Sequence, residues 1–120
     1  MEYKRFFDKM LAHMDALDAR GFASSFTEGG ILRLANNEPV VGRDRIENDM
    51  AGFCSAIGGL RHDFQNCWAL EDRAFANGLV TYLRKDGSTL TVPWATIARF
   101  EGGKLAEYDV YVDSSKLFNP

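Results

Sequence analysis

Apolar residues in the first twenty positions recur at spacings of three and four, which is typical of one face of an amphipathic α-helix. Glycine suits the position after a helix, so we expect this helix to end near Arg20-Gly21. A short helix is predicted over residues 22–26, and a third helix is predicted after Gly42. The apolar stripe of the first helix comprises Tyr3, Phe6, Phe7, Met10, Leu11, Met14 and Leu17, and that of the third comprises Ile46, Met50, Phe53, Cys54 and Ile57.

Apolar and polar residues alternate through much of the remaining chain, with the period of two that a half-buried β-strand shows. A short strand is predicted at residues 31–34. Residues 79–113 predict three strands joined by turns at Asp86-Gly87 and Gly102-Gly103, because glycine adopts positive φ without a steric penalty. Before them, residues 60–70 predict a strand whose buried face carries His62, Phe64, Asn66, Trp68 and Leu70.

The order of these elements is helix, short helix, strand, helix and then four antiparallel strands. This order predicts an α+β fold with the helices on one side of the sheet. A chain of this length is expected to form one domain, covering residues 1–120.

Charge and composition narrow the range of partners. The net charge is −3 and lysine and arginine do not cluster, so neither nucleic acid nor a membrane is an expected partner. No apolar run is long enough for a signal peptide or a membrane span, and a cytoplasmic location is therefore expected. Histidine, cysteine and carboxylate residues lack metal-ligand spacing and no phosphate loop occurs, so neither a metal nor a cofactor is expected.

Four segments in this order resemble the SnoaL-like branch of the nuclear transport factor 2-like superfamily. They are the aromatic first helix, GFASSFTEGGILRLANNEPVVGRDRI, VTYLRKDGSTLTVPWATIARFEGGKL and EYDVYVDSSKLF. The resemblance implies a cone, in which a strongly curved antiparallel sheet wraps around three N-terminal helices and a pocket opens at the wide end. It also implies a homodimer that packs sheet to sheet.

The same resemblance orients the strands. It places Tyr82, Asp109 and Tyr111 on the face away from the pocket. A shift of one residue would exchange the two faces of a strand. The residues that it places on the pocket face are Leu79, Thr81, Leu83, Val92, Trp94, Thr96, Ala98, Tyr108, Val110 and Val112.

Three catalytic relatives provide templates, and the chain departs from two of them. The base of ketosteroid isomerases falls on Arg33 or Leu34, and neither residue abstracts a proton at neutral pH. The water-activating residues of limonene epoxide hydrolases fall on the uncharged residues Leu79, Thr81 and Val110. SnoaL-type polyketide cyclases use an aspartate as acid and base. For that role the last strand offers Asp109, which would enter the pocket only if the register shifted by one residue, and Asp113, which is better interpreted as a helix cap.

The candidate site therefore consists of aromatic rings, a few hydrogen-bonding groups and an aliphatic wall, which is typical of a site for a small hydrophobic or aromatic molecule. His62 is the best base candidate because the unperturbed imidazole pKa is about 6.5; Tyr108 and Asp109 are the other catalytic candidates. The two tryptophans could instead simply fill the core. The predicted ligand-binding residues are Trp94, Thr96, Trp68, Asn66, Leu32, Leu34 and Val110.

Two kinds of function fit this site. The first is a cofactor-free isomerase, cyclase or hydrolase. The second is a non-catalytic protein that sequesters a ligand or associates with a partner through its sheet.

Overall fold

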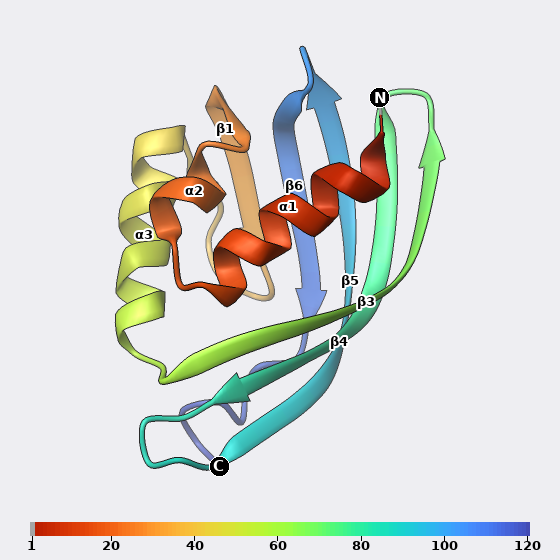
Figure 1. The fold of residues 1–120 in the computed structure, drawn as a ribbon. Coiled ribbons are helices and arrows are strands. Elements are labelled where there is room, and N and C mark those ends of the chain that lie inside the picture. Colours follow the sequence, from red (N-terminus) through yellow and green to blue (C-terminus); the bar gives the residue numbers. More distant parts are fainter. Residues whose placement is uncertain (1) are drawn as a thin grey trace.

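The computed structural model describes residues 2–120, which form three helices on one face of a six-stranded curved sheet (Figure 1). The strand order is β2-β1-β6-β5-β4-β3, and every neighbouring pair is antiparallel except β1 and β6, which run parallel. The elements are α1 (Tyr3–Asp15), α2 (Ala19–Ala23), β1 (Phe26–Leu34), β2 (Val40–Val41), α3 (Arg43–Ser55), β3 (Gly59–Leu70), β4 (Arg73–Leu83), β5 (Thr89–Glu101) and β6 (Lys104–Val112).

The helix α1 lies across the concave face of the sheet (Figure 1). Its predicted apolar stripe is the buried face, which includes Phe7, Met10, Leu11 and Met14. The helix ends at Asp15, earlier than predicted, because Leu17 adopts a positive φ of 55° and breaks it.

Residues near the predicted end of α1 instead begin the second helix. Asp18 caps α2 by accepting a hydrogen bond from the Gly21 backbone at 2.9 Å, and such a cap satisfies one of the free N–H groups of a first helical turn. The prediction of a short helix over residues 22–26 was displaced by three residues, since Phe26 already belongs to β1. The third helix, α3, packs against α2 and β1 and buries Ile46, Met50 and Cys54.

The long strands β3, β4 and β5 bend along their length and carry the sheet around the helices (Figure 1). The turns between β4, β5 and β6 contain glycines with positive φ, as predicted: Gly87 at 90°, Gly102 at 57° and Gly103 at 79°. None of the helices within residues 2–120 is both long and apolar enough to cross a lipid bilayer.

The predicted inward face of β4 was wrong by one residue. Leu83 pairs with Thr89 across the turn, so odd-numbered residues of β4 share the outer face with odd-numbered residues of β5. Leu79, Thr81 and Leu83 therefore point away from the helices, and Val80 and Tyr82 point toward them. The predicted inward faces of β5 and β6 have the correct parity: Trp94, Thr96, Ala98 and Tyr108 are buried, and Val110 and Val112 are partly buried.

A β-bulge in β3 corrects a second prediction. Phe64 pairs with Gly78 and Asn66 pairs with Asn77, which leaves Gln65 as an extra residue. An extra residue moves every later side chain to the opposite face. Asn66, Trp68 and Leu70 consequently lie on the outer face, where the relative exposure of Trp68 is 55% and that of Leu70 is 66%.

Candidate functional site

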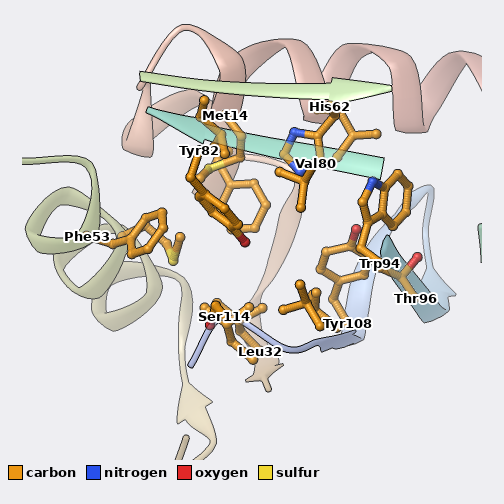
Figure 2. A pocket seen from close by; sticks show the side chains of 17 residues that line it. Met14, Leu32, Phe53, His62, Val80, Tyr82, Trp94, Thr96, Tyr108 and Ser114 are labelled. Atoms are coloured by element: carbon orange, nitrogen blue, oxygen red, sulfur yellow. The ribbon is translucent and has the colours of Figure 1, made fainter. Parts of the chain in front are cut away.

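A cavity of about 70 Å³ lies between the concave face of the sheet and the helices (Figure 2). Its walls come from all three helices, from every strand except β2 and from the segment after β6. They are mainly aliphatic and aromatic. The lining residues are Leu11, Met14, Phe22, Leu32, Leu34, Met50, Phe53, Leu60, His62, Val80, Tyr82, Trp94, Thr96, Tyr108, Val110, Val112 and Ser114.

Most of the residues predicted for the site do meet in this lining. They are His62, Tyr108, Trp94, Thr96, Leu32, Leu34 and Val110. Asn66 and Trp68 do not, because the bulge turns both outward, and their predicted place in the cavity was wrong. Asp109 also lies outside the cavity.

The side chain of His62 is held at the cavity wall by Asp15. His62 Nδ1 lies 2.7 Å from Asp15 Oδ1, and the His62 backbone N–H donates to both oxygens of the same carboxylate at 3.1 Å. We assign the Nδ1–H tautomer from this contact, because an ionised carboxylate only accepts hydrogen bonds. The lone pair is then on Nε2, which has no hydrogen-bond partner within residues 2–120 and belongs to a ring that reaches into the cavity (Figure 2).

Asp15 is the functional residue that sequence analysis missed. It is the last residue of α1 and is 47 positions from His62, so no local pattern connects the two. The helix was expected to end near Arg20, so the sequence did not place this carboxylate at a helix C-terminus, where the partial negative charge of the helix end disfavours it. An aspartate in that position needs compensation, and His62 provides it.

Trp94 fixes the other side of the imidazole. Its ring meets that of His62 edge to face, with centroids 5.6 Å apart, and its indole Nε1 donates to the Leu79 carbonyl at 2.9 Å. The indole N–H is thus satisfied by the sheet, and the ring is left as an apolar wall. His62 is consequently confined between a carboxylate and an aromatic ring, and 15% of its side chain is exposed.

Two tyrosines, one threonine and one serine supply hydroxyl groups to the cavity. Burial raises the pKa of Tyr82 from 10 to about 12. Burial also raises the pKa of Tyr108 well above its usual value. The nearby Thr96 hydroxyl lowers that pKa by a smaller amount, although its position relative to Tyr108 is not that of a hydrogen bond. Both phenols are neutral near pH 7 and can donate hydrogen bonds.

The hydroxyl of Thr96 is fully buried and has no partner within the described chain. A buried polar group of this kind normally binds water or a ligand, since leaving it unpaired costs about 1–3 kcal/mol. The cavity therefore has hydrogen-bonding capacity that the protein itself does not use.

Asp109 belongs to an ion-pair network on the outer face of the sheet. Arg33 Nη1 donates to Asp109 Oδ1 at 2.9 Å, and Arg33 Nη2 donates to Glu107 Oε1 at 3.0 Å. Arg99 and then Arg33 lower the pKa of Glu107 by hydrogen bonding to its carboxylate. The hypothesis that Asp109 enters the cavity as an acid is therefore wrong, because its strand has the register that turns it outward.

Asp113, the other carboxylate considered for that role, caps the turn after β6. Its Oδ1 accepts a hydrogen bond from the Ser115 backbone at 3.1 Å. Residues 114–117 form a turn and not the predicted last helical turn.

The arrangement combines a potential base with neutral hydrogen-bond donors in an apolar cavity. An imidazole oriented by a carboxylate can accept a proton at Nε2, and phenol hydroxyls can stabilise an oxygen that becomes negative. Within residues 2–120 no three potential metal ligands lie together. The geometry is suited to proton transfer by side chains.

The sequence of residues 4–108 matches the model of the SnoaL-like domain. The chain belongs to the SnoaL-like domain family. This confirms the resemblance and the curved-sheet fold that it implied. No curated protein matches this SnoaL-like chain in sequence.

Solved structures share the fold at low sequence identity. A protein with a ketosteroid isomerase-like fold from Catenulispora acidiphila, in complex with trimethylamine, is 17% identical with a TM-score of 0.82, over 88% of this chain and 83% of that one. A nuclear transport factor 2-like protein of unknown function from Burkholderia pseudomallei is 12% identical with a TM-score of 0.84, over 96% and 93%. TerC, co-crystallised with polyporic acid, is 16% identical with a TM-score of 0.83, over 95% and 93%. At these identities the likeness shows the fold alone.

Proposed function

We propose that this SnoaL-like protein binds a small, largely apolar carbonyl compound in its cavity and transfers a proton at the carbon next to the carbonyl. The observation that supports the proposal is the contact between His62 and Asp15, which leaves Nε2 without a partner within residues 2–120 on a ring that lines the cavity. The neutral hydroxyls of Tyr82 and Tyr108 line the same cavity. Other proteins of this fold have been crystallised with trimethylamine and with polyporic acid, so complexes of this fold with small molecules are known.

The proposed step is balanced within the site. Nε2 of His62 takes a proton from the α-carbon, and the electron pair of the C–H bond moves onto the carbonyl oxygen, which becomes an enolate. The tyrosine hydroxyls donate hydrogen bonds to that oxygen. The imidazolium, stabilised by Asp15, then returns the proton. Return to a carbon further along a conjugated dienolate is an isomerisation. If the enolate carbon instead attacks a second carbonyl of the ligand, a C–C bond forms and the new alkoxide takes the proton from the imidazolium, which is an aldol cyclisation.

Exchange of α-protons in D₂O tests the proposal without knowledge of the natural substrate. Cyclopentanone serves as the probe, and ¹H NMR follows the loss of its α-proton signal with and without protein. The wild type is expected to accelerate exchange. His62→Gln should lower the protein-dependent rate roughly 100-fold or more, the usual contribution of a positioned base, and Asp15→Asn should lower it less because the imidazole remains.

Asp63→Asn is the matched control. Asp63 follows His62 directly in the sequence but is exposed on the other face of β3, so its replacement should leave exchange unchanged. Circular dichroism of each variant checks that it is folded. Equal rates in the wild type and in folded His62→Gln would exclude His62 as the base.

A non-catalytic ligand-binding function is the alternative, and the apolar character of most of the lining favours it. Under this alternative, cyclopentanone raises the melting temperature of the wild type but its α-protons do not exchange faster. Ligand at 100 times its dissociation constant adds about 2.7 kcal/mol to the free energy of unfolding, so binding is detectable independently of catalysis.

We also propose that two copies associate through the outer face of the sheet. That face carries an apolar patch, the outer patch, and beside it lies the network in which Arg33 pairs with Asp109. Aromatic and arginine side chains are enriched in protein interfaces. The outer patch comprises Trp68, Phe75, Leu79, Pro93, Ile97 and Tyr111.

A further inference from the structure

A second, larger hollow adjoins the cavity at the end of β6. Its volume is about 490 Å³, and it shares Leu34, Phe53, Val112 and Ser114 with the lining of the cavity. Shared walls mean that the two spaces are neighbours, and Figure 2 shows Phe53 and Ser114, two of the shared residues, at the edge of the cavity. We call this space the outer hollow.

The C-terminal segment forms a fixed wall of the outer hollow. Leu117 is buried in the core, with 1% of its surface exposed. Arg84, which precedes the turn between β4 and β5, donates from Nε to the Leu117 carbonyl and from Nη2 to the Lys116 carbonyl, both at 2.9 Å. Its Nη1 also donates to Ser88 at 3.0 Å. One guanidinium thus ties the segment to the sheet beside the cavity.

The size of the cavity by itself suits only a very small molecule. Ligand sites usually occupy about 300–1,000 Å³, and the cavity occupies about 70 Å³. The outer hollow has the missing volume and a suitable apolar surface, which includes Phe53 and Phe118. Phe118 is 58% exposed, so more than half of this residue is left uncovered within residues 2–120.

Charge further restricts what the outer hollow accepts. Its lining contains no lysine, arginine or histidine among the described residues, and its single ionisable residue is Asp113. The remaining polar groups there are amides and hydroxyls, those of Asn36, Asn37 and Asn119 among them. A carboxylate or phosphate on the ligand would therefore face Asp113 in this lining, while Lys116, whose charge acts on Asp113, lies outside the lining.

We propose that the ligand of this site spans both spaces, with a carbonyl head in the cavity and an uncharged aryl or alkyl tail in the outer hollow against Phe53 and Phe118. This inference rests on the proposed function and adds to it the shape and charge of the ligand. A compact ketone occupies only the cavity. A ketone with an aromatic tail buries additional apolar surface and binds more tightly.

Fluorescence of Trp94 measures binding at the cavity wall. The chain has two tryptophans, and Trp68 lies on the outer face, so Trp68→Phe leaves Trp94 as the only reporter. In this background the probes are 2-butanone, 4-phenyl-2-butanone and the analogue of the latter with a carboxylate on the ring. The phenyl ketone should bind roughly tenfold or more tightly than 2-butanone, and the carboxylate should remove that advantage.

Phe118→Ala tests the place of the tail. Because Phe118 is exposed, its replacement should not unfold the protein. It should weaken binding of the phenyl ketone roughly threefold to tenfold and leave 2-butanone unchanged. Leu70→Ala is the control, since Leu70 is also an exposed apolar residue but lies at the far end of β3 and outside both spaces.

The outcomes separate this inference from the proposed function. If cyclopentanone exchanges its α-protons but the phenyl ketone binds no more tightly than 2-butanone, a ligand that spans both spaces is excluded, and the proposed proton transfer by His62 is retained. A ligand that spans both spaces is also excluded if Phe118→Ala weakens the binding of both ketones equally. If neither ketone binds and no exchange occurs, both proposals are excluded.

Discussion

Burial keeps the phenols of Tyr82 and Tyr108 neutral, and this has a consequence for stability at alkaline pH. The pKa of Tyr82 is about 12 in the folded protein and 10 in the unfolded reference. A group whose pKa is raised by folding contributes its full stability below the unfolded pKa and loses it as pH rises through the folded pKa. The folded state should therefore lose stability between about pH 10 and pH 12.

Tyr82→Phe should reduce this alkaline loss. The wild type is expected to lose roughly 2 kcal/mol through Tyr82 between pH 9 and pH 11.5, because each unit of pKa difference corresponds to about 1.4 kcal/mol. Phenylalanine has no proton to lose, so the variant should show a shallower decline. Urea denaturation at a series of pH values measures both slopes, and identical slopes would contradict the assigned burial effect.

At the level of single residues, the family resemblance together with alternation along a strand was sufficient to predict part of the site. The resemblance placed Trp94, Thr96 and Tyr108 inward, and the placement is correct because β5 and β6 keep an uninterrupted period of two where these residues lie. Asp15 was not predicted, since its partner His62 is brought to it by the packing of α1 on β3. Contacts between distant segments leave no period in a sequence.

At the level of elements, the bulge in β3 depends on Gly78 in the neighbouring strand. A Cβ at position 78 would collide with the Asp63 carbonyl and would lie 3.2 Å from the Gln65 backbone nitrogen. Only a residue without a side chain lets the bulged strand approach this closely. Gly78 therefore determines where the later residues of β3 turn outward.

Gly78→Ala should destabilise the protein by about 2 kcal/mol or more, because the collision is with backbone atoms that cannot move aside. Gly29→Ala in β1 is the matched control: nothing lies within 4 Å of a Cβ built there, so this change should be neutral or slightly stabilising. Urea denaturation compares the two. A stable Gly78→Ala variant with an unshifted β3 would contradict the role of this glycine.

The presence of the helices, the run of antiparallel strands after α3 and the turns between them could be predicted because each depends on local chemistry. The apolar stripe of α1 and the glycines at positions 87, 102 and 103 illustrate this. The bulge in β3 could not be predicted, because Gln65 differs from the residues beside it only in having no pairing partner in β4. The inward and outward sides of β4 were predicted wrongly, because they follow from the pairing of Leu83 with Thr89 and not from the composition of the strand.

At the level of the whole molecule, the outer patch leads to a prediction about association. Trp68 and Tyr111 are 55% and 57% exposed, which is unusual for rings of this size unless a partner covers them. Light scattering should give a mass near twice the 13.5 kDa of one chain.

Charge placed in the outer patch should separate the two copies. Tyr111→Arg is expected to give a monomer, since it introduces a cation into a desolvated interface. Val41→Arg is the control, because Val41 is an apolar residue of similar exposure on β2, at the opposite edge of the sheet from β3. A wild type that scatters as a single chain would exclude the dimer.

The parallel pairing of β1 with β6 determines when the protein can acquire its shape during synthesis. Phe26 pairs with Leu105 and Leu34 with Val110, while the other strand next to β1 is the two-residue β2. As the ribosome releases the chain from its N-terminus, β1 must wait for almost the entire polypeptide before its main partner emerges. Pairing over such sequence separations slows folding. A nascent chain that stalls before β6 would expose an unfinished sheet edge and have no cavity.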